Sequence, residues 1–416
     1  MTSTPTASAD QHASTARSAE FRSGLPALIF ATIGAAFGYA ALAYFVGVLV
    51  VPLGEEFGWN RGEVTMVNLF SGIGLAVLLP FVGALADRRG IRVVSFIAIP
   101  VFALLIAALA FFDGELWLFL GTYAVLGAAG SGTSAVIYAK VVATSFDRHR
   151  GLALGILAAG LGSVGLIFPP LMGAATAAYG WRSTFAIMAA LAILPLFVLF
   201  FVKLPVAAEG STVKVANSQL PGMAPAQALR RREFWMLMVI FFLIGWALLT
   251  LVPHFVPMLI DADVEPVLAA TLSSMVGVGT VIARPILGWF YDRFNAIYVS
   301  VPLFGLAALG ILLLLVTGAG LAPLTALFIG IAFGAEIDLM AYLSSRYLGP
   351  RAFGRLYGVI YSSFTIGAAL GPVAAGYLFA AQGTYSTALV IAIVTLVLGT
   401  AVLLFLPKYP RTAAEE

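Results

Sequence analysis

The sequence contains no cysteine and few charged residues. Its 416 residues include three histidines, and Asp, Glu, Lys and Arg together make up 10%. The lack of cysteine excludes disulfides, thiolate metal sites and cysteine nucleophiles. Soluble globular proteins carry about 25% charged residues, so this chain is too poor in charge to build an ordinary solvated surface. It is instead 61% hydrophobic, with a mean hydropathy of +1.03, which indicates a membrane protein.

Apolar runs of about twenty residues recur along the whole chain, and each is long enough to cross a bilayer as a helix. We therefore expect an all-α membrane protein with twelve transmembrane helices. The predicted spans are roughly 26–50, 64–86, 93–112, 116–144, 152–175, 183–203, 234–257, 267–290, 297–317, 321–344, 355–379 and 385–407.

The polar stretches divide the chain into two halves. Residues from about 1 to 25 are small and polar, and we interpret them as a disordered cytoplasmic tail. A six-helix domain is predicted over about 26–203, a cytoplasmic linker over about 204–231 and a second six-helix domain over about 232–407. Residues from about 408 to 416 form a second cytoplasmic tail.

The distribution of basic residues predicts the orientation in the membrane. With both termini in the cytoplasm, 18 of the 22 Lys and Arg residues fall on the cytoplasmic side. Arg61 and Arg182 fall outside, and Lys140 and Arg284 lie within predicted spans. Since positive charge gathers on the cytoplasmic face, this imbalance favours cytoplasmic termini.

The two halves repeat each other. "GALADRRGIR" follows the second span, and "GWFYDRFNAI" follows the eighth about 205 residues later. In the first copy, Gly83 and Gly90 allow close helix approach and a tight turn, and Asp87 and Arg88 lie at the membrane boundary. We expect either a gating contact or simple anchoring by positive charge. The residues concerned are Gly83, Asp87, Arg88 and Gly90 in the first copy and Gly288, Asp292 and Arg293 in the second.

These paired segments resemble the loop signature of the major facilitator superfamily and its weaker second copy. The likeness covers about residues 25–407 and implies two pseudo-symmetric six-helix halves in the major facilitator fold. It also implies that the charged segment closes the cytoplasmic side when the transporter is open outward. Transport would then proceed by alternating access of one central site.

Four ionisable residues lie inside predicted spans, where charge is costly and is a functional hypothesis by default. Lys140, Arg284 and Asp338 are each ~12 Å from the cytoplasmic end of their helix, and Glu336 is ~15 Å from it. They can therefore share one layer. Glu336 and Asp338 are predicted to face different sides of their helix, and one of them is expected to carry a coupled proton. Depth slightly favours Asp338, because it is level with Arg284.

"ARPILG" at positions 283–288 resembles the span 8 Arg-Pro of the monocarboxylate transporter and oxalate/formate antiporter branch. That resemblance implies that Arg284 binds the substrate carboxylate; the alternative is a structural pair between Arg284 and one of the acids. Lys140 is a second candidate ligand because it lies within a span, and its alternative role is to extend to the lipid headgroups. The chain departs from the branch at Thr280 and Val51, where many members carry Asp and Lys. It also lacks a lysine in span 11, where oxalate-type members have one. A monoanion therefore fits better than a dianion.

Further polar side chains are weaker candidates for the transport route. His254, near the outer end of span 7, is a candidate for substrate contact, gating or titration, or for a simple hydrogen bond at a helix end. Tyr361, Tyr44 and Tyr138 have polar tips suited to lining the route, although packing or interface roles fit each of them as well.

The sequence thus predicts a secondary transporter of a small organic monocarboxylate, coupled to proton symport. The alternative is an exporter of drugs or other amphiphiles that works by proton antiport. A membrane-embedded enzyme or sensor fits less well, because we find no clustered catalytic groups, metal site, cofactor motif or ATP-binding motif. We expect a monomer in the bacterial inner membrane, with the bilayer, an organic anion and protons as partners and no nucleic acid.

Overall fold

A computed structural model describes residues 7–146, 150–202, 223–349 and 353–407. These ranges contain α-helices and short 3₁₀-helices and no strand, which confirms the all-α fold class. Eleven segments within them are long and apolar enough to cross a membrane. One segment, Ala296–Leu348, is 53 residues long and contains two helices, which is why the segments number eleven although twelve spans are predicted.

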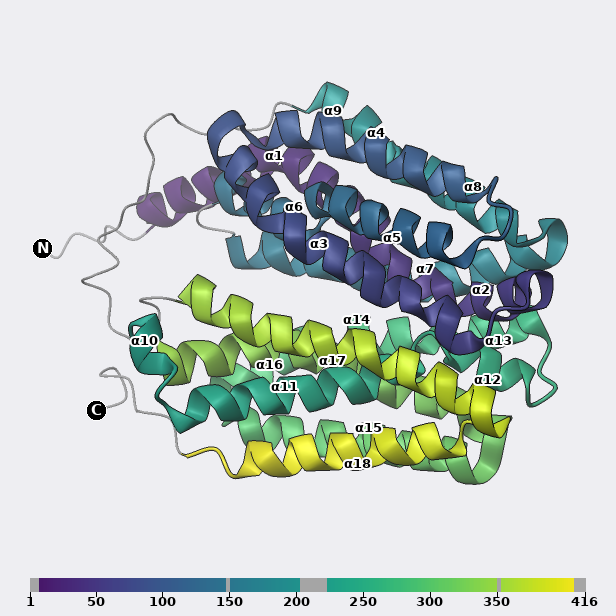
Figure 1. Ribbon diagram of the computed structural model, residues 1–416. Coiled ribbons are helices and arrows are strands. Elements are labelled where there is room, and N and C mark those ends of the chain that lie inside the picture. Colours follow the sequence, from purple (N-terminus) through teal and green to yellow (C-terminus); the bar gives the residue numbers. More distant parts are fainter. Residues whose placement is uncertain (1–6, 147–149, 203–222, 350–352, 408–416) are drawn as a thin grey trace, which may run out of the picture.

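The described residues of the first half form nine α-helices and two 3₁₀-helices (Figure 1). They are α1 (Ala7–Phe37), η1 (Tyr39–Ala41), α2 (Leu42–Phe57), α3 (Arg61–Arg89), α4 (Ile91–Leu109), α5 (Leu116–Gly130), η2 (Ser131–Thr133), α6 (Ala135–Ser145), α7 (Arg150–Tyr179), α8 (Trp181–Ala192) and α9 (Leu194–Phe201).

The second half follows the same plan. It contains α10 (Pro225–Ala228), α11 (Arg232–Leu251), α12 (Phe255–Ile260), α13 (Pro266–Ser273), α14 (Met275–Arg293), α15 (Ala296–Thr317), η3 (Gly318–Leu321), α16 (Ala322–Leu348), α17 (Phe353–Gln382) and α18 (Ser386–Leu404).

Several predicted spans are broken into shorter helices. The first span divides at η1, the fourth at η2, and the eighth between α13 and α14 at Ser274. Non-helical backbone at membrane depth is tolerated where it is buried in protein or lines a cavity. Discontinuous helices of this kind are common around transporter binding sites.

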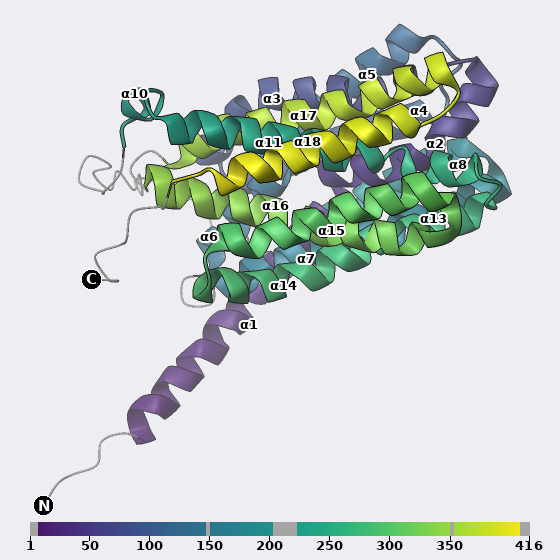
Figure 2. The same ribbon diagram turned by 90° about the horizontal axis from the view of Figure 1, so that it is seen from below.

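The beginning of the chain differs from the prediction. A disordered tail was expected up to residue 25, but α1 begins at Ala7 and continues into the first span. Figure 2 shows this helix projecting from the bundle toward the N-terminus. The physical reason lies in the composition of the segment: alanine recurs between Ala7 and Ala19 with no Gly or Pro among them, which favours helix continuation from the span outward.

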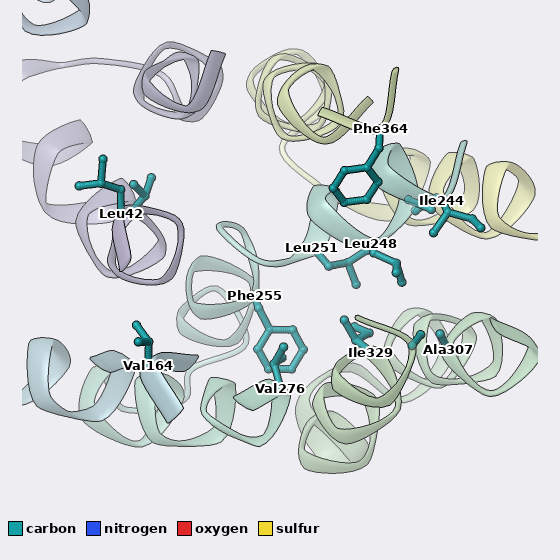
Figure 3. Close-up of a cluster of buried hydrophobic side chains, with 14 of the residues drawn as sticks. Leu42, Val164, Ile244, Leu248, Leu251, Phe255, Val276, Ala307, Ile329 and Phe364 are labelled. Carbon is teal, nitrogen blue, oxygen red and sulfur yellow. The ribbon is translucent and has the colours of Figure 1, made fainter. Parts of the chain in front are cut away.

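The two halves lie side by side and pack unevenly along their length. The start of α1 and the end of α18 lie at one end of the bundle, where the halves diverge, and the halves meet toward the opposite end, marked by α2, α12 and α13 (Figure 1). We call that opposite end the far end; in the predicted orientation it faces outward. A cluster of buried hydrophobic residues draws on both halves, with Leu42 and Val164 from the first and Phe255, Val276 and Phe364 from the second (Figure 3).

Small residues allow the halves to touch. Gly165 of α7 and Gly277 of α14 are so close that a Cβ on Gly165 would lie 3.2 Å from the Cα of Gly277. Beyond them, Gly173 of α7 faces Ala270 of α13. Close backbone approach through small residues is the usual way in which membrane helices associate. It places the middle of α7 directly against the helix that carries Arg284.

Candidate functional site

Arg284 lies in the middle of α14, and its position is determined by tight packing of α14 against α16. A Cβ added to Gly334 of α16 would lie 3.0 Å from the carbonyl oxygen of Thr280 and 3.0 Å from the Cβ of Ala283. The two helices therefore cross with little more than backbone between them. Since Glu336 follows two residues after Gly334, this crossing brings Arg284 and the acidic residues of α16 into one region.

Arg284, Glu336 and Asp338 interact electrostatically, as their shared depth predicts. Glu336 is fully buried, at 0% exposure, and Asp338 is partly buried. Within the described part of the chain, neither carboxylate oxygen of Glu336 has a hydrogen-bond partner, and neither has the buried Nε of Arg284. Buried polar groups are normally hydrogen-bonded. Arg284 therefore attracts these acids without forming a direct ion pair with them. The hydrogen-bonding capacity of the Arg284 Nε and of both Glu336 oxygens is unused.

Tyrosines from both halves surround these charges. Tyr44 of α2 interacts electrostatically with Arg284 and Glu336, and its ring lies against Gly165 of α7. Tyr361 of α17 interacts with Glu336 and with Tyr39 of η1. The charged groups of the second half therefore face aromatic side chains of the first half, which places the candidate site at the interface between the halves.

Tyr357, one turn before Tyr361, was not singled out in the sequence. Its ring lies 6.1 Å from that of Tyr361, and it interacts electrostatically with both Glu336 and Asp338. A spacing of four residues puts two side chains on the same helix face, and the Tyr-x₃-Tyr pattern of α17 is the signal that could have identified it.

Lys140 and Tyr138 both belong to α6 of the first half. Tyr138 is fully buried in a hydrophobic cluster with Phe30, and the two rings are 5.6 Å apart. This contact supports the packing interpretation of Tyr138. Lys140 is half-buried on α6, which packs against α1 and α7. Its role as a substrate ligand stays a prediction.

Thr280 explains one departure from the monocarboxylate branch. Its hydroxyl donates to the carbonyl oxygens of Val276, at 2.8 Å, and of Gly330, at 3.1 Å. Thr280 therefore links α14 to α16 as a packing residue. The acids near Arg284 come from α16 instead of from the preceding turn of α14.

His254 lies away from this charged cluster, in the turn between α11 and α12. It is fully buried, with Nδ1 2.9 Å from the hydroxyl of Tyr385 and Nε2 2.8 Å from the carbonyl oxygen of Pro372. Both ring nitrogens are thus occupied by protein groups near the far end. Of the four roles considered for His254, this geometry favours a gating or structural one.

The repeated charged segments lie at the end where the halves diverge. Gly90 has a φ of +84° at the end of α3, as the predicted tight turn requires. The predicted close approach at Gly83 is wrong for this structure: a Cβ there, or at Gly288, would meet no atom within 4 Å. The reason is that both glycines lie toward the diverging ends of the halves.

The charged residues of these segments are described only in part. Arg88 is exposed in the last turn of α3, and the guanidinium of Arg293 lies 4.0 Å from the centre of the Trp289 ring. The side chains of Asp87 and Asp292 lie outside the described residues. A gating role for these segments therefore stays a prediction.

Comparison with known proteins identifies the family. The model of the Major Facilitator Superfamily matches residues 28–361. The chain belongs to the Major Facilitator Superfamily. It is accordingly an integral multi-pass membrane protein with the fold of a transporter, in agreement with its apolar helices.

Relatives within the superfamily include transporters of several kinds. Bovine monocarboxylate transporter 13 is 26% identical over 88% of this chain and 88% of its own length. The MFS-type transporter YcxA of Bacillus subtilis is 25% identical over 88% of this chain and 91% of its own length. The multidrug resistance protein MdtG of Proteus mirabilis is 24% identical over 85% of this chain and 89% of its own length.

Solved structures of the superfamily share the fold. The nucleoside transporter NupG matches with a TM-score of 0.74 at 15% identity, over 92% of this chain and 99% of its own. A bacterial homologue of the human lysosomal transporter Spinster, in an inward-facing and unoccupied conformation, matches with a TM-score of 0.68 at 16% identity. That match covers 93% of this chain and 96% of the homologue.

Proposed function

We propose that this superfamily member is a secondary transporter that carries a small organic monocarboxylate by alternating access, together with protons. The main support for the proposal is the environment of Arg284. This residue is a cation at membrane depth, at the interface between the halves, and among the described residues its side chain donates no hydrogen bond. An intramembrane charge is retained only at a cost, and a planar guanidinium is suited to grip a carboxylate with two parallel bonds.

Glu336 is the proposed proton carrier. A buried carboxylate without hydrogen-bond donors is least costly when it is protonated. Protonation also removes the negative charge that competes for Arg284, so a substrate carboxylate binds best after the proton has arrived. The depth argument from the sequence favoured Asp338, but the complete burial of Glu336 and its unpartnered oxygens favour Glu336.

The experiment compares two kinds of transport in proteoliposomes, after a screen with radiolabelled lactate, pyruvate, acetate, oxalate and aromatic acids. Glu336→Gln should abolish accumulation driven by an imposed pH gradient and spare counterflow, since exchange needs no net movement of protons. Asp338→Asn, its matched control on the same helix, should keep both activities. Accumulation by both variants would show that neither acid carries the coupled proton.

Export of amphiphiles by proton antiport is the second candidate function. It is favoured by the three tyrosines near the buried charges, Tyr44, Tyr357 and Tyr361, and by similarity to a multidrug resistance protein. Efflux of an amphiphilic dye such as ethidium from dye-loaded cells that maintain a proton gradient distinguishes the two candidates. Faster dye efflux on expression of the chain, with no carboxylate counterflow, would replace the monocarboxylate proposal.

A further inference from the structure

Arg61 joins the two halves at the far end of the bundle. It is the first residue of α3, and its guanidinium donates to both carboxylate oxygens of Asp261, which follows α12 in the other half, at 2.6 Å each. A bidentate bond between guanidinium and carboxylate is among the strongest polar contacts in proteins. Arg61 is partly buried in this pair, with a side-chain exposure of 16%, whereas Asp261 is exposed, at 34%.

A chain of hydrogen bonds extends this contact into the interior. Arg61 donates to the hydroxyl of Tyr385 at 2.9 Å, and that hydroxyl lies 2.9 Å from Nδ1 of His254. Nε2 of His254 lies 2.8 Å from the carbonyl oxygen of Pro372. Because a carbonyl can only accept, Nε2 carries the hydrogen, and in the neutral ring Nδ1 accepts from Tyr385. Both ring nitrogens of His254 and the hydroxyl of Tyr385 are then satisfied.

The same carbonyl also receives a bond from the first half. The hydroxyl of Thr65, one turn after Arg61, lies 3.2 Å from the oxygen of Pro372. One carbonyl of α17 is therefore bound by His254 from its own half and by Thr65 from the other.

Local structure holds Arg61 in place for this contact. Asn60 and Glu63 form a reciprocal capping box at the start of α3, which determines where the helix begins. The guanidinium lies 3.9 Å from the centre of the Phe379 ring, a favourable contact between a cation and an aromatic face. In addition, Gly62 of α3 packs directly against Gly376 of α17, where neither glycine leaves room for a side chain.

We propose that Arg61, Asp261, Tyr385 and His254 form an outer lock, which holds the halves together in the state described here and must open for the transporter to face the far side. In this assignment Arg61 and Asp261 are the two sides of the lock. Tyr385 and His254 are positioning residues that tie it to α17.

A cavity of about 140 Å³ lies directly inside the outer lock. Residues of both halves line it, among them Tyr39, Asn68, Thr365 and Pro372. Pro372 thus belongs to the cavity wall and accepts the bond from His254. When the outer lock opens, this cavity is the first space that becomes accessible from the far side.

The test measures access to the cavity from the far side. Because the chain has no native cysteine, Asn68→Cys supplies a single thiol in the cavity wall. A membrane-impermeant maleimide is added to oriented vesicles, first on one side of the membrane and then on the other. With Asp261→Asn, labelling from the far side should accelerate at least about tenfold, the factor that corresponds to loss of one charge-assisted hydrogen bond. An unchanged rate would overturn the proposal.

Two controls make the result specific. The charge-swapped pair Arg61→Asp with Asp261→Arg should slow labelling again, which also shows that the effect is not a folding defect. Arg182→Gln removes the other arginine of the predicted outer loops, whose partner Glu56 lies in the same half, and should leave the rate unchanged. Equal acceleration by Arg182→Gln, or no slowing in the charge swap, would contradict the outer lock. No substrate is present, so the outcome does not depend on what the protein carries.

Discussion

Arg61 and Arg284 both lie where the two halves meet, and their surroundings are opposite. Arg61 makes three hydrogen bonds, two to Asp261 and one to Tyr385, and stacks on an aromatic ring. Arg284 makes none within the described part of the chain, and its nearest acidic neighbours interact with it only at longer range. A guanidinium whose donors are used stabilises one arrangement of the halves, whereas one whose donors are unused is available to a ligand.

A third arginine clarifies what makes Arg61 special. Arg182 of α8 is also predicted to lie on the outer side, and it donates to Glu56 at 2.7 Å and to the carbonyl oxygen of Phe112 at 3.2 Å. All of these partners belong to the first half. The Arg182 contacts therefore survive any rigid movement of one half against the other, and those of Arg61 do not.

The largest effect is expected from Arg284→Lys. This substitution preserves the charge and removes the planar guanidinium that can donate two parallel hydrogen bonds to a carboxylate. Loss of a bidentate carboxylate bond should weaken substrate binding by at least ~1.5 kcal/mol, or more than about tenfold. The half-saturating concentration in counterflow measures this. In the Asn68→Cys background, labelling from the far side should not change, and wild-type counterflow would remove Arg284 from the substrate site.

A smaller effect is expected from His254→Phe, which keeps an aromatic ring and removes two hydrogen bonds of the outer lock. Both of these bonds lie within the second half, so the bond between the halves that depends on His254 is the one from Arg61 to Tyr385. Weakening that single bond by about 1 kcal/mol should accelerate labelling of the Asn68→Cys thiol from the far side roughly fivefold. Substrate affinity in counterflow should stay as it was, because His254 is bound to Tyr385 and Pro372. A change in affinity without a change in labelling would return His254 to the substrate site.

The smallest effect is expected from Glu56→Gln. The Arg182–Glu56 pair is largely exposed, and pairs of this kind contribute less than about 1 kcal/mol. Thermal unfolding in detergent should shift only slightly, and the labelling rate of the Asn68→Cys thiol should not move. Strong acceleration of labelling would mean that the first half itself rearranges when the far end opens.

Part of the candidate site could be predicted from the sequence. Arg284, Glu336 and Asp338 stood out because ionisable residues are rare in apolar spans, and counting residues along a helix places them at one depth. Depth alone could not show that Glu336 is buried with its oxygens unpartnered and that Asp338 is only partly covered. That difference depends on how α16 is rotated, which the close crossing at Gly334 determines.

The sequence by itself determined the class of the protein, because the length of an apolar run and the placement of charges around it are local properties that the bilayer selects directly. It also singled out the unusual charges, including Arg61 as one of two arginines in the predicted outer loops. Only the tertiary structure decided which of them meet. Arg61 is 200 residues from Asp261 and 324 from Tyr385, so these contacts exist only where the two halves come together. No periodicity in the chain encodes a contact between the two halves.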